Sequence, residues 1–235
     1  MIGASADRTE WQRAVDEQGF AVVPGVFSAA ETIALLMSLA GLTERSRRAG
    51  VRHVLSHPTI NLIARDRRLM RIVQPVLGSE ALPFRATLFD KSPGSNWLIA
   101  WHQDTALPLR EKRETPGWGP WSVKEGVTYA HAPARALEQV LALRVHLDDS
   151  TQENGPLRVL PGTHQMGVLT DEQISCQSKG QSSVECLVAK GSVFAIRPLI
   201  IHASSKSRSD NPRRVLHIEY AARPNIDGIL TLAIT

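Results

Sequence analysis

The sequence predicts a mainly β protein, built as an antiparallel sandwich or barrel with helices packed outside it. Two observations predict this class: helical periodicity is confined to about the first 78 residues, and many short strand-like segments divided by turn residues fill the rest. Helices first and strands afterwards are typical of a sheet core with helices on its outside. A chain of 235 residues can build one well-buried core, so we expect a single domain over residues 1–235.

Three helices are expected in an N-terminal part that covers about residues 8–78. They are predicted over residues 8–18, 28–40 and 58–77. Ser28 is a helix N-cap, and Glu31, three residues later, completes a capping box. Gly78 follows the last apolar position of the third helix and ends it. A strand-like run over residues 20–23 lies between the first two helices.

The β core is expected over about residues 82–235, in short segments divided by turn signals such as Asn154-Gly155-Pro156. The predicted strands cover residues 84–90, 97–102, 140–147, 157–160, 184–188, 192–196, 199–203, 214–221 and 229–234. Short strands of this kind, with turns between them, are typical of antiparallel sandwiches and barrels.

Composition excludes several classes of protein. Hydrophobic residues make up 43% of the chain and charged residues 21%, which is ordinary for a globular protein. No apolar run approaches the length of a membrane span, and the N-terminus lacks the apolar stretch of a secretory signal. Cys176 and Cys186 lie in a polar region and are predicted to be free thiols. We therefore expect a cytoplasmic protein with no membrane partner.

The chain carries a net charge of +4, and part of the basic excess lies in two runs of arginines. The runs consist of Arg45, Arg47, Arg48 and Arg52, and of Arg65, Arg67, Arg68 and Arg71. A nucleic-acid-binding patch is one interpretation. Because Glu44 and Asp66 interrupt the runs and no aromatic residues alternate with them, solvated helix faces and no nucleic-acid partner are favoured. One or two of these arginines could instead steer an anionic substrate.

Three residues predict the chemistry of the protein. His102 and Asp104 are two residues apart in a strand-like segment, so both side chains project from the same face. His202 follows an apolar run 98 positions after Asp104 and would complete a set of three ligands. Two histidines and one carboxylate form the facial triad that binds Fe(II) and leaves coordination positions open. Each part of this pattern is common by itself, but the set predicts a non-haem iron oxygenase.

The longest stretch without clear periodicity, about residues 105–133, directly follows the His-x-Asp pair. It is rich in proline and glycine and contains Trp118, Trp121, Tyr129 and His131. Loops of this length inside a compact domain are functional or disordered, and the aromatic residues argue against disorder. We expect a lid over the metal, with these four residues as candidate substrate contacts. The alternative is that the tryptophans only fix the loop to the barrel.

A carboxylate-binding group is predicted beside the triad. Arg213 lies eleven residues after His202 and enters the next strand, which in a jelly roll brings its guanidinium across the metal pocket. Arginine binds a carboxylate through two parallel hydrogen bonds. Ser204 shares the face of His202 and can donate to the same carboxylate. Lys91, at a hairpin-like turn before the metal-binding strand, either reaches a carboxylate or is solvated.

Arg214 is the alternative to Arg213 as the carboxylate-binding residue. Strand alternation groups Arg213 with the polar His217 and Glu219, whereas Arg214 falls on the face of the apolar Leu216. A polar face suits a wet pocket, so Arg213 is preferred.

Two further histidines are expected to have structural roles. His146 shares a strand face with Arg144 and Asp148, and this polar face either lines the pocket or, as we expect, faces solvent or a structural network. His164 lies in the turn Pro161-Gly162-Thr163-His164 and is expected to be structural.

Taken in order along the chain, these motifs resemble a bacterial member of the phytanoyl-CoA dioxygenase-like family of Fe(II)/2-oxoglutarate oxygenases. The resemblance starts near residues 18–27 and runs through His102 and Asp104 to His202 and Arg213. It includes Leu147-Asp148-Asp149, Asn154-Gly155-Pro156-Leu157 and Pro161-Gly162-Thr163-His164. It implies a double-stranded β-helix, the jelly-roll core of cupin-like proteins. It also implies Fe(II) held by the triad, and 2-oxoglutarate that chelates the iron with its distal carboxylate on Arg213, helped by Ser204.

The activity that the resemblance implies is hydroxylation of an unactivated C–H bond of a small metabolite. The reaction uses O2 and 2-oxoglutarate and releases succinate and CO2. Related halogenases have a small residue in place of the carboxylate ligand, so Asp104 favours hydroxylation. The basic balance favours an anionic substrate. Two alternatives are a cupin-like metal enzyme that does not use 2-oxoglutarate and a non-catalytic small-molecule-binding module on the same scaffold.

Overall fold

The computed structural model describes residues 8–43 and 50–235, and these residues form a mainly β architecture flanked by helices. The α-helices are α1 (Glu10–Glu17), α2 (Ala29–Ser38), α3 (Ala40–Thr43), α4 (Pro58–Ala64), α5 (Arg67–Leu77), α6 (Ala134–Leu137) and α7 (Asp171–Gly180). Two 3-10 turns are η1 (Val54–Ser56) and η2 (Thr163–Met166).

The described strands form four sheets, in which neighbouring strands are antiparallel. The largest has the order β1 (Phe20–Val23), β11 (Val193–Ile196), β8 (Val140–His146), β13 (Arg213–Ala221), β3 (Leu82–Lys91), β2 (Gly50–Val51). The second has the order β10 (Val184–Cys186), β9 (Leu157–Val159), β12 (His202–Ser204), β4 (Ile99–His102). The others are β5 (Ala106–Leu109), β7 (Val127–His131), β6 (Trp121–Lys124), and the pair β14 (Asn225–Ile226) and β15 (Leu230–Thr231).

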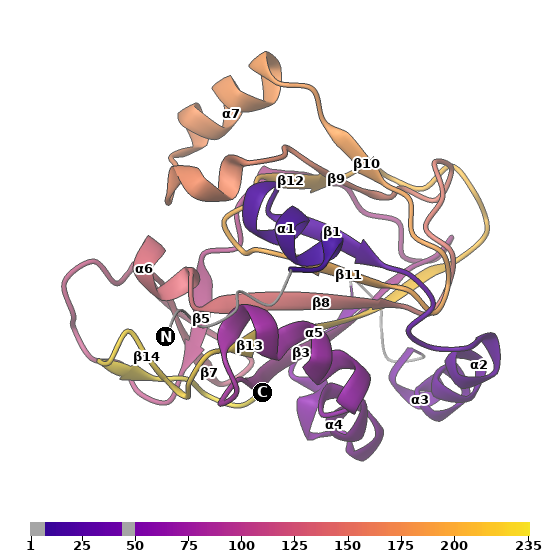
Figure 1. Ribbon diagram of the computed structural model, residues 1–235, viewed down its shortest axis with the longest axis horizontal. Coiled ribbons are helices and arrows are strands. Elements are labelled where there is room, and N and C mark those ends of the chain that lie inside the picture. Colours follow the sequence, from indigo (N-terminus) through magenta and orange to yellow (C-terminus); the bar gives the residue numbers. More distant parts are fainter. Residues whose placement is uncertain (1–7, 44–49) are drawn as a thin grey trace, which may run out of the picture.

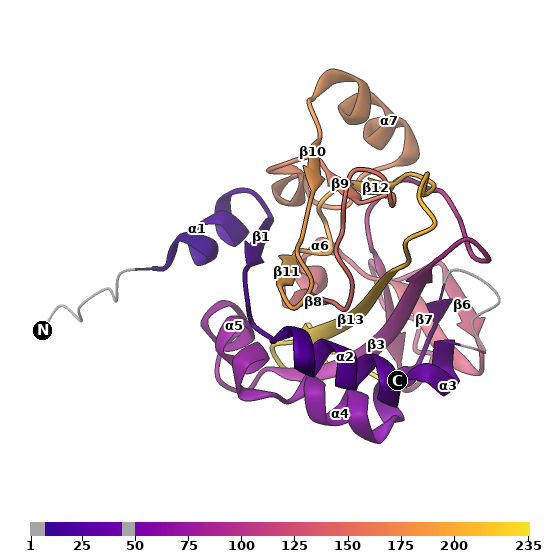
Figure 2. The ribbon, with the colours of Figure 1, turned by 90° about the vertical axis from the view of Figure 1, so that its right-hand side faces the viewer.

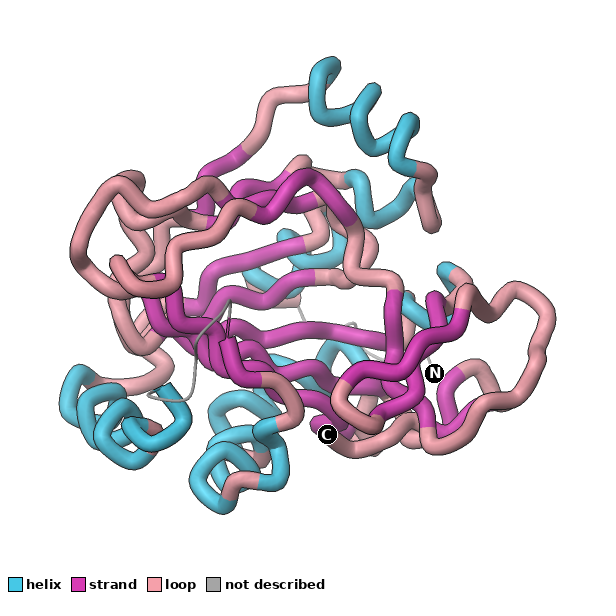
Figure 3. The backbone as a smooth tube through the Cα atoms, turned by 180° about the vertical axis from the view of Figure 1, so that it is seen from behind, coloured by secondary structure: helices cyan, strands magenta, loops and turns pink. Residues whose placement is uncertain are grey.

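The two larger sheets lie face to face. In Figure 1 the six-stranded sheet crosses the middle of the molecule, the four-stranded sheet lies above it with α7, and α2 to α5 lie below it. Figure 2 shows the same layers after a quarter turn. From behind, in Figure 3, the strands of both sheets are seen one above the other, and most helices lie outside the larger sheet. The space between the sheets is therefore the place where inward-facing side chains of both can meet.

The N-terminal helices follow the predicted pattern with one difference. Ser28 caps α2 in a capping box, since the Glu31 N–H donates to Ser28 Oγ at 3.2 Å and the Ser28 N–H donates to Glu31 Oε2 at 2.8 Å. The helix expected over 58–77 is divided into α4 and α5. Asp66 causes the break, because its Oδ1 accepts from the Arg68 N–H at 2.8 Å and so caps a new helix.

The strands also follow the predicted order, and the main difference concerns residues 105–133. This segment is not a long loop: β5, β6 and β7 form a three-stranded sheet within it. The expectation of a long loop over this segment was wrong, because strands of four or five residues are too short to show clear alternation. Glu125 and Gly126 form the turn between β6 and β7, and both have positive φ, as a two-residue hairpin turn requires.

Alternation along the central strands divides apolar from polar side chains. In β13, Leu216, Ile218 and Tyr220 belong to the hydrophobic cluster between the large sheet and the helices, together with Leu141 and Leu143 of β8. The intervening residues, which include Arg144, His217 and Glu219, point into the space between the sheets and line a cavity there. The outer face of these central strands is thus apolar, and their inner face carries the polar residues of the cavity. A separate apolar cluster, which includes Phe194 and Ile196 of β11 and Val159 of β9, fills another part of the space between the sheets.

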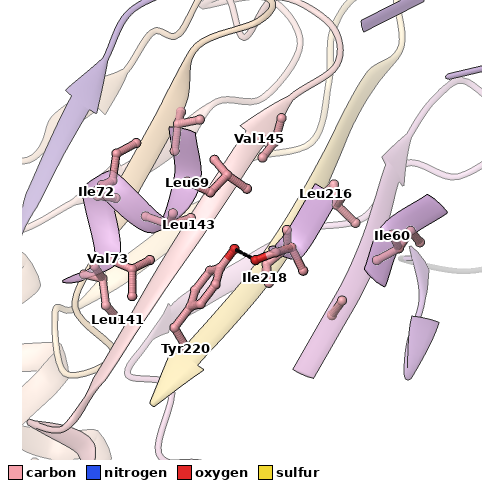
Figure 4. Close-up of a cluster of buried hydrophobic side chains, with 14 of the residues drawn as sticks. Ile60, Leu69, Ile72, Val73, Leu141, Leu143, Val145, Leu216, Ile218 and Tyr220 are labelled. Atoms are coloured by element: carbon pink, nitrogen blue, oxygen red, sulfur yellow. Dashed lines mark hydrogen bonds between the residues drawn. The ribbon is translucent and has the colours of Figure 1, made fainter. Parts of the chain in front are cut away.

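The main hydrophobic core lies between this outer face and the helices. Figure 4 shows Leu69, Ile72 and Val73 of α5 packed against residues of β8 and β13. Tyr220 is fully buried there, and its hydroxyl donates to the carbonyl of Ala64 at 2.9 Å. This bond satisfies the only polar atom of the Tyr220 side chain and ties the end of α4 to the sheet.

Two further predictions from composition can be compared with the structure. Cys176 is exposed and Cys186 is buried, and both are free, as predicted. Among residues 8–43 and 50–235, no helix has the length and apolar character needed to cross a bilayer.

Leu143 offers a direct test of this core. It is fully buried in β8, whereas Leu62 on α4 is 74% exposed. Leu143→Ala is expected to lower the free energy of unfolding by about 2–5 kcal/mol, because it leaves a cavity in the core. Leu62→Ala is the matched control and should change it by no more than about 0.5 kcal/mol. Urea unfolding followed by circular dichroism measures both, and equal losses would contradict the assignment of the core.

Candidate active site

The two strands that carry the predicted metal ligands are neighbours. β4 and β12 pair antiparallel, with His102 opposite His202 in the register. The two imidazole ring centres are 4.2 Å apart. Asp104 follows β4, and its carboxylate oxygens lie 3.6 Å from His102 Nε2 and 3.5 Å from His202 Nε2. One ligand atom from each residue lies within 4.8 Å of the other two, so the structure brings the predicted triad together.

Backbone carbonyls orient both imidazole rings. His102 Nδ1 lies 2.9 Å from the Ala100 carbonyl oxygen, and His202 Nδ1 lies 3.0 Å from the Ile200 carbonyl oxygen. A carbonyl can only accept, so each Nδ1 carries the hydrogen and each Nε2 presents a lone pair. This is the arrangement in which a metal-binding histidine is usually held.

The residue between the ligands, Gln103, fixes the position of the metal-binding segment. Its side-chain Nε2 donates to the Leu199 carbonyl at 2.7 Å and to the Gly167 carbonyl at 2.9 Å, while its Oε1 accepts from the Leu169 N–H at 2.8 Å. Gln103 points away from the triad, as strand alternation predicts, and ties it to the turn before β12.

The charges of the triad suit a divalent cation. Burial would raise the pKa of the Asp104 carboxyl, but His202 and His102 outweigh that effect and hold the pKa well below its usual range. Burial lowers the pKa of His202 to about 4, against the opposing effect of Asp104. An ionised carboxylate and a neutral imidazole are the protonation states that bind metal.

The donor set therefore fits Fe(II). Two imidazole nitrogens and one carboxylate, all presented from one side, match the facial triad of non-haem Fe(II) sites, and they leave the opposite side for other ligands. The open side faces a cavity of about 290 Å³ between the two sheets, lined by all three residues. A small molecule in this cavity would lie next to the metal.

Arg213, Ser204 and Lys91 form a second polar group in the same region. Lys91 and Arg213 are opposite each other on β3 and β13, and both side chains are buried. The Lys91 ammonium donates to Ser204 Oγ at 2.8 Å and to the Ser205 carbonyl at 2.5 Å. Arg213 Nη2 lies 3.4 Å from Ser204 Oγ, and Nε donates to the Asn154 carbonyl at 3.3 Å. The sequence left two alternatives for Lys91, contact with a carboxylate or solvation. Burial of the side chain excludes solvation.

These two buried cations have no carboxylate partner in the described part of the chain. Burial, and then the nearby Arg213, lower the pKa of the Lys91 ammonium to about 7. Burial, and then Arg144, lower the pKa of the Arg213 guanidinium to about 9. Burying unpaired positive charge is costly, and an anionic ligand would offset that cost. The group is therefore suited to bind a carboxylate.

The Asn-Gly-Pro turn builds one wall of this carboxylate group. Gly155 has φ +67°, and a Cβ there would lie 2.4 Å from the Ser205 carbonyl oxygen and 3.1 Å from Lys91 Nζ. The positive φ and the lack of space for a Cβ both exclude other residues, so only glycine fits. The Gly155 carbonyl also accepts from Ser204 Oγ at 3.0 Å. The turn motif singled out in the sequence thus lies beside Lys91 and Ser204.

Arg214 lies on the other face of β13. Its Nε and Nη2 donate to the two carboxylate oxygens of Asp148 at 2.7 and 2.8 Å, which is a bidentate ion pair. Because its guanidinium is engaged there and does not line the cavity, the geometry favours Arg213 for a ligand carboxylate.

Four charged or polar residues that the sequence did not assign to the site line the cavity farther along the inner face of the large sheet. Arg85 and Glu219 form a buried bidentate ion pair across β3 and β13, with Arg85 Nη2 donating to Glu219 Oε1 at 2.6 Å. Arg144 Nη1 lies 3.3 Å from His217 Nδ1. Of the two alternatives for the face of Arg144, lining of the pocket is the one observed, and the preferred alternative of solvent or a structural network was wrong for this residue, which is buried at the cavity wall. Three of these residues could have been found from the sequence. Polar and apolar residues alternate along β8 and β13, and this pattern places Arg144, His217 and Glu219 on the polar face.

The cavity mouth is formed by the sheet of β5, β6 and β7 and by the chain after β2. The residues of these segments that line the cavity include Tyr129, which is buried, and the exposed His131, Arg52 and Lys124. The Tyr129 hydroxyl lies 2.7 Å from His53 Nε2, and His131 Nδ1 lies 2.7 Å from the Thr105 hydroxyl.

The two tryptophans predicted to contact substrate lie elsewhere. Trp118 is buried in a hydrophobic cluster with Leu107 and Leu137, and Trp121 packs against that cluster. Neither lines the cavity. The alternative interpretation, in which these residues fix the segment to the rest of the protein, fits their packing, because large aromatic rings stabilise a small sheet by burial.

Two other histidines lie away from the cavity, in line with structural roles. We expected His146 to face solvent or a structural network. It is buried on β8 and does not face solvent. His164 packs against Gly19, and its Nε2 lies 3.1 Å from the Asp16 carbonyl oxygen. Of the first basic run, Arg45, Arg47 and Arg48 lie outside the described residues, and Arg52 lines the cavity. In the second run, Arg68 forms ion pairs with Asp66 and Glu31.

A sequence model of the phytanoyl-CoA dioxygenase (PhyH) family matches residues 15–215. The chain belongs to this family. The resemblance drawn from the ordered motifs is therefore confirmed, and so is the jelly-roll fold that it implied.

Two curated proteins are similar in sequence to this phytanoyl-CoA dioxygenase family member. The L-proline trans-4-hydroxylase of Streptomyces griseoviridis is 27% identical over 138 residues, which cover 48% of this chain and 51% of that protein. The ectoine dioxygenase of Bordetella bronchiseptica is 28% identical over 177 residues, which cover 68% of this chain and 49% of that protein. The chain thus spans about half the length of the curated relatives that it matches.

Solved structures share the fold at low sequence identity. The structure of EctD from S. alaskensis in its apoform has a TM-score of 0.69 at 20% identity and covers 94% of this chain and 79% of that one. HygX from Streptomyces hygroscopicus, with nickel and 2-oxoglutarate bound, has a TM-score of 0.63 at 19% identity and covers 91% of this chain and 86% of that one.

The buried Lys91 predicts a specific dependence of stability on pH. Its pKa in the folded protein is lowered to about 7 from the ordinary 10.5, so between these values the unfolded chain binds more protons than the folded one. The free energy of unfolding of the ligand-free wild type should therefore rise with pH across this range, relative to Lys91→Met, by up to about 1.4 kcal/mol per pH unit.

The measurement is urea unfolding of both proteins at several pH values from 7 to 9, without metal or 2-oxoglutarate. Lys179 is exposed on α7, and Lys179→Met is the matched control, for which the difference from wild type should be constant with pH. A constant difference for Lys91→Met as well would show that Lys91 keeps its proton in the folded protein.

Proposed function

We propose that this protein is an Fe(II)- and 2-oxoglutarate-dependent oxygenase that hydroxylates an unactivated C–H bond of a small molecule. In this reaction one atom of O2 enters the substrate as a hydroxyl group. The other atom enters succinate as 2-oxoglutarate loses CO2. Family membership supports the reaction class, and the residues of the cavity support the two cosubstrates.

One observation carries the proposal: two complementary groups occupy one cavity. A set of donors suited to Fe(II), His102, Asp104 and His202, lines its wall. Arg213 and Ser204 line it too, with Lys91 behind Ser204, and the two cations lack a carboxylate partner among the described residues. A dicarboxylate with a chelating keto acid at one end satisfies both groups at once, which a monocarboxylate does not.

The roles of the residues follow from their contacts. The triad would hold Fe(II) from one side, and when bound the metal would supply the means to activate O2 at its open coordination positions. The carbonyls of Ala100 and Ile200 keep the imidazole rings from rotating, because each accepts from an Nδ1–H. The donor atoms thus keep their positions throughout turnover.

The other end of 2-oxoglutarate would be bound by Arg213, Ser204 and Lys91. Arg213 is suited to two parallel hydrogen bonds with the distal carboxylate. The Ser204 hydroxyl donates to the Gly155 carbonyl at 3.0 Å, and on rotation it would donate a third bond to the ligand. Lys91 has a pKa of about 7 without ligand, so the arrival of a carboxylate favours a proton on Nζ. This protonation strengthens the attraction and orients the cosubstrate from the carboxylate group towards the metal.

Substrate would enter on the side of β5, β6 and β7. Tyr129 and His131 are our candidates for contact with it, since both line the cavity mouth. Closure of this segment over the substrate would exclude water from the metal. A cavity of about 290 Å³ is at the small end of ligand pockets, which supports a small substrate. The two curated relatives are named for reactions on small molecules, L-proline and ectoine. A reducing cytoplasm would suit both Fe(II) and the free thiols of this chain.

The decisive experiment is anaerobic reconstitution with Fe(II) and 2-oxoglutarate. We expect a metal-to-ligand charge-transfer band in the visible spectrum, and release of succinate when O2 is admitted. An iron enzyme that does not use 2-oxoglutarate would bind Fe(II) but form no succinate. A non-catalytic module would bind 2-oxoglutarate without turnover. The absence of the band with metal-loaded protein would overturn the proposal.

Arg213 and Arg214 form a matched pair for testing the cosubstrate site. Arg213→Ala should raise the Kd for 2-oxoglutarate at least about 30-fold, because truncating one partner of a buried charged contact costs about 2–5 kcal/mol. Arg214→Ala removes the ion pair with Asp148 and should change this Kd by less than about threefold. Anaerobic titration calorimetry of the metal-loaded proteins measures both values. A larger effect of Arg214→Ala would reverse the assignment.

A further inference from the structure

We infer that the substrate is a small organic acid, held at the cavity mouth by Arg52 and Lys124 through its carboxylate or phosphate group, and that it carries no ammonium group. The inference rests on the proposed function, because it assigns the substrate of the same cavity. It concerns residues that neither the iron triad nor the 2-oxoglutarate group uses.

The charge of the cavity wall favours an anion. Its described residues include five cationic side chains, of arginine and lysine, and two carboxylates. Fe(II) would add two positive charges and 2-oxoglutarate two negative ones, so they cancel. Arg85 is paired with Glu219, Glu125 outside the lining lies 3.8 Å from Arg52, and Asp104 is the carboxylate of the described lining that remains for Lys124, Arg144 and Arg213. The loaded cavity thus keeps an excess of positive charge, which attracts an anionic substrate.

The same wall offers no partner for an ammonium group. Arg85 binds both oxygens of Glu219, through Nε and through Nη2. Asp104 belongs to the metal triad. These are the two carboxylates in the described lining of the cavity, and both are engaged. An amino group placed there would lose its hydration without gaining a counter-charge, which is costly.

Arg52 and Lys124 reach the mouth from distant parts of the chain. Arg52 follows β2, and Lys124 ends β6, directly before the hairpin turn. Glu125, at that turn, links them: its carboxylate lies 3.8 Å from Arg52 Nη1 and 3.6 Å from His53 Nδ1. His53 in turn lies 2.7 Å from the Tyr129 hydroxyl. Arg52 thus contacts this cluster through the Glu125 carboxylate, and Lys124 contacts it through the ring of Tyr129.

The backbone at this cluster is strained. His53 has φ +57° and Glu125 has φ +52°, in the left-handed region that few non-glycine residues adopt. Of the non-glycine residues with positive φ that the structure describes, these two directly follow Arg52 and Lys124, and the third is Asp227. Strained backbone is concentrated at ligand-binding sites, where other contacts hold it in place. At Glu125 this conformation is also the one that the two-residue hairpin turn requires.

Tyr129 connects the mouth to the interior. Its ring centre lies 5.3 Å from Lys124 Nζ and 5.6 Å from the guanidinium carbon of Arg85, which is buried deeper in the wall. The Tyr129 ring is buried with His53, Lys124 and Arg85 around it, so an acid anchored on Arg52 and Lys124 would extend its carbon chain past this group. Its distal carbons would then point into the cavity that the metal triad lines.

The test uses four probes that share a five-carbon chain: pentanoate, pentyl phosphate, methyl pentanoate and the zwitterion norvaline. Each is titrated into the anaerobic protein loaded with Fe(II) and 2-oxoglutarate, and binding is followed by calorimetry and by the change in the charge-transfer band. We expect at least one of the two anions to bind, and the neutral ester and norvaline to bind at least about tenfold more weakly. The better anion distinguishes carboxylate from phosphate chemistry.

The variants test the residues. Arg52→Gln/Lys124→Gln should weaken binding of the anion by about tenfold and reduce its dependence on salt, since screening acts on exposed charges. The matched control is Arg110→Gln/Lys112→Gln, an arginine and a lysine that are exposed and do not line the cavity, and it should bind the anion like wild type. The Kd for 2-oxoglutarate, measured in all proteins, verifies that the cosubstrate site is intact.

Three outcomes would overturn the inference. They are binding of norvaline or the ester as tight as that of the anions, equal anion affinity in both double variants, and no binding of either anion by protein that binds Fe(II) and 2-oxoglutarate. Failure to bind Fe(II) and 2-oxoglutarate is a different result. It contradicts the proposed function itself.

Discussion

The antiparallel pairing of β12 with β4 is the interaction on which the whole site depends. It sets His102 opposite His202 and leaves Asp104 at the end of β4, within 3.6 Å of both imidazoles. Contacts with the turn that contains Pro198 and Leu199, and not contacts among the ligands, determine this geometry. The Asp104 N–H donates to the Pro198 carbonyl at 3.0 Å, and the Gln103 side chain donates to the Leu199 carbonyl. The three ligands are thus held by contacts other than those with a metal, as a precise site requires.

The second constraint is the positive charge buried on the inner face of the large sheet. Leucine, isoleucine and tyrosine side chains on the outer face supply the apolar core, and the same strands carry Arg144, Arg213 and Lys91 inwards. Arg85 has a carboxylate partner, whereas these three have none among the described residues. Such charges reduce the stability of the ligand-free protein, and anions that bind there restore it. Function and stability are thus opposed at this face, as is common at binding sites.

The fold and the cavity mouth have different relations to other proteins. The jelly roll is shared with solved structures at about one-fifth sequence identity, for example at 20% with EctD. A fold shared at that level does not define a substrate, which depends on the side chains placed on it. In this chain the mouth combines a small three-stranded sheet with residues that follow β2. A cluster of His53, Glu125 and Tyr129 joins the two parts.

The sequence by itself determined the features that arise from local pattern. The capping box of α2, the order of the strands and the orientation of Arg213 rather than Arg214 towards the interior could be predicted, because capping and alternation act over a few residues. The metal ligands could be proposed as well, since their residue types and order match one kind of site. Only the tertiary structure decided which charges are buried together. Lys91 meets Ser204, and Arg52 meets Glu125, through pairings between residues more than 70 positions apart, and local pattern carries no information about contacts at that distance.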